Sequence, residues 1–127
     1  MAVYGETITL PGLAAGGDLS AVQYKVVKLA STAGQVIVVN ATTDVALGIL
    51  QNDPDAAGQP ALVAALGVAK AIVGVADLVV GEHLGFNSTG QLVDHATDNR
   101  RKIGIALEPS TAVGDIVRVL LQGLSRY

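Results

Sequence analysis

Cysteine is absent from this 127-residue chain, which excludes a disulfide framework and any zinc site built on thiolates. Aromatic residues are also scarce, because three tyrosines and one phenylalanine leave no platform for stacking bases or sugars. The eight basic residues are scattered, and the net charge is −3. A nucleic-acid binder needs a basic footprint to neutralise phosphates. We therefore expect no nucleic-acid partner.

The chain also lacks the signals of secretion and of membrane insertion. Its opening, MAVYGETITLPG, has neither a basic segment nor the long apolar run of a signal peptide. The most apolar stretch, 61–80, is interrupted by Lys70 and Asp77, whereas a membrane helix needs about 20 apolar residues. We expect no membrane span. The mean hydropathy of +0.50 is high for a free monomer and indicates apolar surface buried against a partner.

Alanine, valine, leucine and isoleucine supply the apolar mass, and fifteen glycines punctuate it. β-branched residues favour pleated, half-buried surfaces, and frequent glycines favour tight turns. The length corresponds to one domain. The composition therefore predicts a single all-β domain of many short strands.

The two halves of the sequence align without a gap at a constant offset of 56 in the numbering. Glycines at turn or close-contact positions carry the match: Gly34/Gly90, Gly48/Gly104, Gly58/Gly114 and Gly67/Gly123. The first pair is expected to close hairpin turns, and the third pair to end longer loops between two strands. Glycine and valine are abundant here, so single matches can arise by chance. The common offset predicts a duplication with halves at about 22–67 and 78–123.

Alternating or continuous apolar runs predict the strands. The expected strands are Glu6–Leu10, Gln23–Leu29, Gln35–Val39, Ala46–Gln51, Ala61–Leu66, Val68–Val73, Glu82–Phe86, Gln91–His95, Lys102–Leu107 and Ile116–Gln122. The alanine-rich segment Ala56–Ala65 could be helical, but Gly58 and Pro60 argue against it. Two strand-hairpin-strand units would pack with an approximate twofold into a small β-barrel or a sandwich, and the barrel is favoured.

Metal sites are not indicated. His83 and His95 are the only histidines, and neither belongs to a metal-binding motif such as HExxH. His95 with Asp94 and Asp98 could hold a cation, but a polar turn is the simpler interpretation. We expect no metal and no cofactor.

Catalytic motifs are missing as well. Ser88, His83 and Asp94 could form a triad on paper, but no G-x-S-x-G segment exposes the serine. The segment GLAAGGD (12–18) lacks the signature of a phosphate-binding loop and is expected to be a flexible turn or linker. Lys70 could be the modified lysine of a lipoyl- or biotinyl-type carrier domain, but it falls within a predicted strand. We expect no enzyme.

Four segments covering nearly the whole chain resemble the capsid cement, or head decoration, proteins of tailed bacteriophages. They are GETITLPG (5–12), DLSAVQYKVVKL (18–29), LGILQNDPDAAGQPALVAALGVAKAIVG (47–74) and IGIALEPSTAVGDIVRVLL (103–121). The resemblance implies a protein without catalytic residues that binds the outside of the expanded head, often as a homotrimer. There it would bridge subunits of the major capsid protein against DNA pressure. It also implies location in the virion after synthesis in the bacterial cytoplasm.

In related decoration proteins an N-terminal arm becomes ordered on the shell. By this resemblance residues 1–17 would be the arm with its glycine-rich hinge, and 18–127 the β domain. The Thr-Ile-Thr-Leu alternation suits strand addition to the capsid protein. The candidate capsid-binding residues are Val3, Tyr4, Thr7, Ile8, Thr9 and Leu10. An edge strand of the chain's own domain is the alternative structure for this segment. Alternative functions are a tail or head-fibre base, or a carrier or ligand-binding domain.

Overall fold

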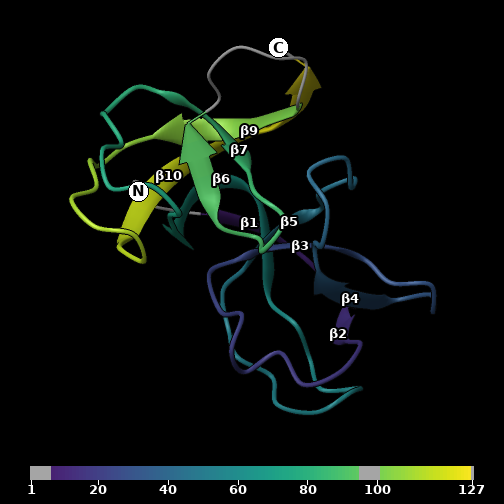
Figure 1. Ribbon diagram of the computed structural model, residues 1–127. Coiled ribbons are helices and arrows are strands. Elements are labelled where there is room, and N and C mark those ends of the chain that lie inside the picture. Colours follow the sequence, from purple (N-terminus) through teal and green to yellow (C-terminus); the bar gives the residue numbers. More distant parts are fainter. Residues whose placement is uncertain (1–6, 95–100, 127) are drawn as a thin grey trace, which may run out of the picture.

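The structure is a computed structural model that describes residues 7–94 and 101–126 (Figure 1). In these ranges the chain forms ten strands and no helix, which confirms the all-β prediction. The strands are β1 (Thr7–Leu10), β2 (Ala14–Ala15), β3 (Val26–Leu29), β4 (Gln35–Val38), β5 (Gly48–Leu50), β6 (Val63–Ile72), β7 (His83–Phe86), β8 (Leu92–Asp94), β9 (Arg101–Ala106) and β10 (Ile116–Arg126). Val3, Tyr4, His95 and Asp98 lie outside the described residues.

All ten strands belong to one sheet, in the order β2-β4-β3-β5-β6-β10-β9-β7-β8, with β1 added to β6. The ends of this path, β2 and β8, belong to different halves of the chain, and the sheet is not closed into a barrel. The favoured barrel was therefore wrong, and the curled, sandwich-like form of the all-β prediction describes the molecule. No helix in the described ranges is long and apolar enough to cross a membrane.

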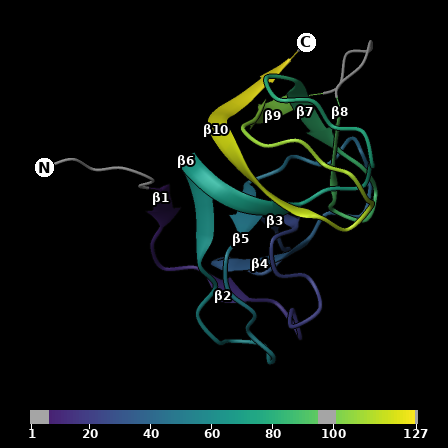
Figure 2. The same ribbon diagram turned by 90° about the vertical axis from the view of Figure 1, so that its left-hand side faces the viewer.

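Strand β6 joins the two halves. Two separate strands were predicted here, but the chain runs without a break through Gly67, which has a φ of +91°. The part before Gly67 pairs with β1 and β5, and the part after it pairs with β10. Figure 2 shows β6 as the long curved strand between the elements of the first half and those of the second. We use "first half" for residues 7–66 and "second half" for residues 67–126.

The strand registers repeat between the halves. Ile49 and Leu50 of β5 lie opposite Ala64 and Val63 of β6. Adding 56 to each number gives the observed pairing of β9 with β10, Ile105 with Leu120 and Ala106 with Val119. Since both pairs of the first half recur in the second with one register, the duplication predicted from the glycines is present in the fold.

The matching glycines have matching roles. Gly34 and Gly90 close the β3–β4 and β7–β8 hairpins with φ angles of +80° and +87°. Gly48 and Gly104 instead allow close strand contact, because a Cβ atom at either would overlap a carbonyl oxygen of the neighbouring strand. The overlapping oxygens belong to Ala64 and Leu120, which correspond to each other at the same offset in the numbering.

One part of the repeat has a different offset. Val26 lies opposite Ile49, and His83 lies opposite Ile105, so the offset is 57 between β3 and β7 but 56 between β5 and β9. The turn between β7 and β8 is one residue shorter than the turn between β3 and β4. A shift of the sequence without gaps could not reveal this deletion.

Residues of the first-half strands alternate between two cores. Val27, Leu50 and Val63 belong to the first-half core, with Ala15, Leu19, Val36 and Ala61. Their neighbours Val26, Ile49 and Ala64 belong to the larger core, which consists mostly of second-half residues. The β3-β5-β6 part of the sheet is therefore buried on both faces, and one face carries the second half.

Candidate functional site

The predicted capsid-binding segment lies at the edge of the sheet. Strand β1 runs antiparallel to β6, with Thr7 opposite Gly67 and Leu10 opposite Val63. Thr9 and Leu10 are half-buried. The segment thus has the edge-strand structure that was the alternative to a free arm.

Among the described strands, β6 is the only partner of β1, so the other edge of β1 faces no strand. An unpaired edge presents N–H and C=O groups that can pair with another chain. Opposite the step from Ile8 to Thr9, β6 has one extra residue, Ala65, so the register shift lies in β6 and not in β1. Strand β1 therefore has one edge on β6 and one edge that faces no described strand.

The predicted hinge contains a strand that the sequence did not predict. Ala14 and Ala15 form β2, which runs parallel to β4, and the N–H of Ala14 donates to the carbonyl of Gly34 at 2.9 Å. Gly16 N–H donates to Val36 in the same way. Residues 14–16 are therefore fixed to the sheet in this state, and release of 1–17 as an arm stays a prediction.

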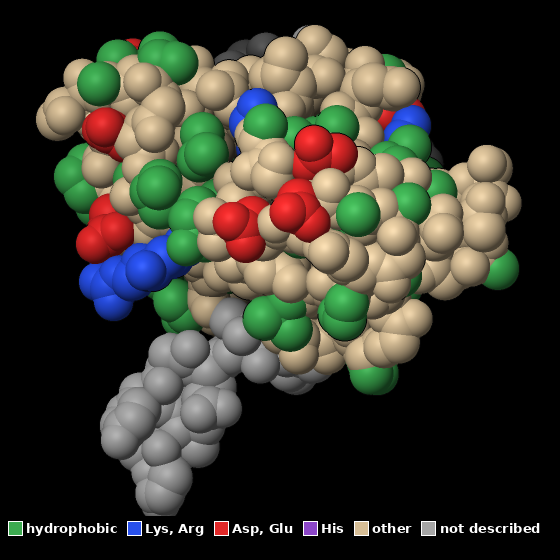
Figure 3. Space-filling view, turned by 90° about the horizontal axis from the view of Figure 1, so that it is seen from below, with side chains coloured by type: hydrophobic (Ala, Val, Ile, Leu, Met, Phe, Trp, Pro, Cys, Tyr) green, Lys and Arg blue, Asp and Glu red, His purple; other side chains and the backbone are tan. Residues whose placement is uncertain are grey.

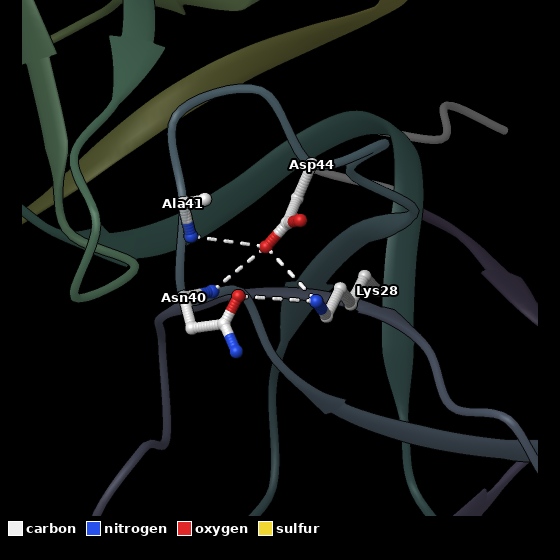
Figure 4. A network of polar contacts seen from close by, with 4 residues as sticks. All are labelled: Lys28, Asn40, Ala41 and Asp44. Atoms are coloured by element: carbon white, nitrogen blue, oxygen red, sulfur yellow. Dashed lines mark hydrogen bonds and ion pairs between the residues drawn. The ribbon is translucent and has the colours of Figure 1, made fainter.

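A polar network beside β3 fixes the loop after β4. One carboxylate oxygen of Asp44 accepts hydrogen bonds from the backbone N–H groups of Asn40 and Ala41, and lies 3.0 Å from Lys28 Nζ (Figure 4). The N–H of Asn40 and the Lys28 ammonium lower the pKa of Asp44. The network is a loop clamp, because this carboxylate oxygen contacts two N–H groups of its own loop and one side chain of the adjacent strand.

The same kind of clamp recurs in both halves. The Gln59 side chain accepts the N–H of Asp55, and Asp115 accepts the N–H of Thr111, and these two pairs correspond to each other at the common offset of the repeat. The backbone N–H of Thr111 also lowers the pKa of Asp115. These side chains hold turns, so the lowered pKa of Asp115 is explained without acid–base catalysis.

The hypothetical triad is not assembled. His83 and Asp94 lie at one end of the β7–β8 hairpin, and Ser88 lies in the turn at the other end. At about 3.3 Å per strand residue, the three steps from His83 to Phe86 already cover about 10 Å, and Ser88 lies beyond Phe86 in the turn. The described residues also contain no group of three or more His, Asp or Glu side chains that could hold a metal.

Lys70 is in the middle of β6, directly opposite Arg118 of β10. A carrier domain displays its lysine at a hairpin tip, and Lys70 does not fit this arrangement. It lines a shallow groove of about 410 Å³ with Tyr24, Glu108, Ile116, Val117 and Arg118. Arg118 is paired with Glu108 at 3.4 Å.

Apolar side chains are exposed in the second half. Val79 and Val80 are more than half exposed, and so are Val113 and Ile116. The sequence signal was their position in or beside turns, where polar residues are usual. The lower face in Figure 3 shows small scattered apolar patches, with acidic side chains gathered near its middle.

Comparison with known proteins places this fold. No curated protein matches the sequence. A similar solved structure is "The crystal structure of head fiber gp8.5 N base in bacteriophage phi29", with a TM-score of 0.69 and 16% identity over 92% of this chain and 95% of that one. At this identity the similarity shows a shared fold. The family model for phage cement proteins matches residues 17–121, and the chain therefore belongs to the phage cement protein family.

Proposed function

We propose that this protein binds the outer surface of the expanded phage capsid and stabilises it by bridging subunits of the major capsid protein. Membership of the phage cement family is the observation that carries the proposal. The protein would act by binding alone, with no catalytic step and no cofactor. The carboxylates with lowered pKa values agree with this role, because hydrogen bonds from backbone N–H groups or from a neighbouring side chain account for them.

Several weak contacts are enough to bridge neighbouring capsid subunits. A molecule that touches several subunits gains avidity without any single strong contact. A closed homo-oligomer, with a trimer favoured, would repeat the same contact around its axis. The exposed apolar residues of the second half provide surface for such contacts.

Pelleting with undecorated expanded heads tests shell binding. Purified protein should sediment with expanded heads at micromolar concentration and remain in the supernatant with unexpanded ones. Heads carrying the protein should also release their DNA at a higher temperature. Protein that stays in the supernatant with expanded heads would contradict the proposal.

We assign the first contact to Val3, Tyr4 and β1, through strand addition at the unpaired edge of β1. Ile8→Pro and Thr9→Pro form a matched pair for testing it. Neighbouring N–H groups of a strand point to opposite sides, so one proline removes an outward N–H and the other a β6-facing N–H. One variant should keep its stability and lose shell binding. Equal shell binding by two folded variants would contradict strand addition.

A head-fibre base is the second candidate function. The shared fold with the phi29 head fiber base favours it, since that protein is described as the base of a fibre. Electron microscopy of particles carrying labelled protein separates the two candidates. Density spread over the whole shell indicates cement, whereas density beneath projecting fibres indicates a base.

A further inference from the structure

The junction between the two halves is a defined contact surface. On the first half it includes a row of three residues, Val26, Ile49 and Ala64, which are fully buried in the larger core. The N–H of Val26 donates to the carbonyl of Gly90 in the β7–β8 turn at 2.9 Å. We call these three residues the receiving face.

The β7–β8 hairpin supplies the other side of the junction. A Cβ atom at Gly90 would lie 2.9 Å from Val38 Cγ2 and 3.2 Å from the Val26 carbonyl oxygen, so only glycine fits against the receiving face. Phe86, at the start of the same turn, is 3% exposed and belongs to the shared core. We call the turn and its first residue the inserting tip.

Because the chain is duplicated, each side of this junction occurs a second time. His83, Ile105 and Leu120 are the second-half counterparts of the receiving face, and they form one row across β7, β9 and β10. In the described structure His83 is exposed, and Ile105 and Leu120 are only half-buried. Residues 7–94 and 101–126 contain two repeat units, so no third unit covers this second receiving face.

The second inserting tip is on the first half. Leu29 is the counterpart of Phe86, since Leu29 lies opposite Val36 as Phe86 lies opposite Leu92. Leu29 is 57% exposed, whereas Phe86 is buried. Gly34 keeps the positive φ of Gly90, although a Cβ there would meet only one atom, the Gly12 carbonyl oxygen at 3.9 Å.

We propose that a second copy of this chain occupies the second receiving face, with its Leu29–Gly34 tip placed as Gly90 is placed within the chain. The contact is head-to-tail, because each copy offers a tip at one end and a face at the other. Such contacts generate a ring when the rotation closes and a filament when it does not. The inference rests on the proposed homo-oligomer and names its surface.

The chemistry of the face sets the strength of this contact. His83 replaces Val26 and the exposed Asp94 replaces Val38, so the second receiving face is more polar than the first. Polar groups must lose water when the tip docks, and this offsets part of the gain from covering Ile105 and Leu120. The contact between copies is therefore weaker than the junction within the chain, and reversible.

Sedimentation velocity across a micromolar-to-millimolar concentration series tests the proposal. The unaltered chain should associate with increasing concentration. Leu29→Asp on the tip and Ile105→Glu on the face should each weaken association about tenfold or more. His83→Glu repeats the face test at an exposed position that does not endanger folding. Val45→Asp is the matched control, because Val45 is 59% exposed and lies outside both surfaces.

Mixing the variants gives the sharpest result. Leu29→Asp retains an intact face and Ile105→Glu retains an intact tip, so their mixture should form dimers that grow no further. A chain that stays monomeric throughout overturns the inference while leaving shell binding to be judged by the pelleting assay. If none of the three substitutions weakens association, the assignment of this contact surface is wrong, although the protein still forms a homo-oligomer. If the face variants reduce pelleting of a monomeric chain, the face binds the capsid instead, and the inference is wrong.

Discussion

Tyr24 adopts the left-handed backbone conformation that Gly81 adopts at the matching position of the second half. The two φ angles are +69° and +91°. Each residue donates its N–H to the end of the neighbouring strand, Tyr24 to Leu50 and Gly81 to Ala106. The turn before β3 thus keeps a conformation that favours glycine although its residue has changed.

Gly81→Ala should lower the free energy of unfolding by about 1–2 kcal/mol. No atom lies within 4 Å of the added Cβ, so the cost comes from the backbone conformation alone. Gly17→Ala is the matched control, because its Cβ is equally free and its φ is not positive. Urea unfolding should show a lower free energy of unfolding for Gly81→Ala and an unchanged one for Gly17→Ala. Equal effects would contradict the left-handed turn.

Gly48→Ala and Gly104→Ala should each destabilise the protein by about 3 kcal/mol or more. The added methyl group would overlap a backbone carbonyl, which cannot turn aside as a flexible side chain can. Thermal unfolding of both variants checks this expectation. A loss at one site without a comparable loss at the other would contradict the structural equivalence of the halves.

Ser110→Ala should cost about 1–3 kcal/mol. The buried hydroxyl donates to the Val75 carbonyl at 2.8 Å and accepts the N–H of Leu78 at 3.0 Å. Its removal leaves both backbone groups without this partner in the core. Chemical unfolding measures the loss, and Ser88→Ala at an exposed turn position should remain within about 0.5 kcal/mol of the unaltered protein.

The contribution of Asp44 should depend on pH. Its pKa is lower in the folded state than in the unfolded state, so the unfolded chain binds more protons between the two values. The stabilisation is complete above the ordinary carboxyl pKa and is lost as the pH falls through the folded value. Asp44→Asn should therefore be less stable than the unaltered protein at neutral pH.

This stability gap should close in acid. Unfolding curves recorded between neutral and strongly acidic pH measure it, with the exposed Asp53→Asn as a control for a general loss of negative charge. A gap of constant size across that range would show that Asp44 acts without its charge.

The sequence predicted most of the fold because glycine reports backbone geometry. Gly34, Gly58, Gly90 and Gly114 were predicted at turns and all have positive φ angles. Gly67 was misleading, since it also has a positive φ yet lies inside continuous β6. Positive φ alone does not distinguish a turn from a bent strand.

Other features left little trace in the sequence. Strand β2 is two alanines, which carry no strand pattern, and its position comes from hydrogen bonds to Gly34 and Val36. Neither the open sheet nor the surface of the receiving face could be predicted, because both depend on which strands meet across the duplication. The capsid-binding residues stay a prediction, since the described β1 edge gives only their placement.

Strand β6 belongs to both halves of the duplication, so the two halves cannot be pulled apart as separate units. Its first residues complete one core and its last residues begin the other, so no cut in the chain would release two intact halves. A load applied to either half passes to the other along a covalent backbone. The molecule should therefore unfold in a single cooperative step, both under force and in denaturant.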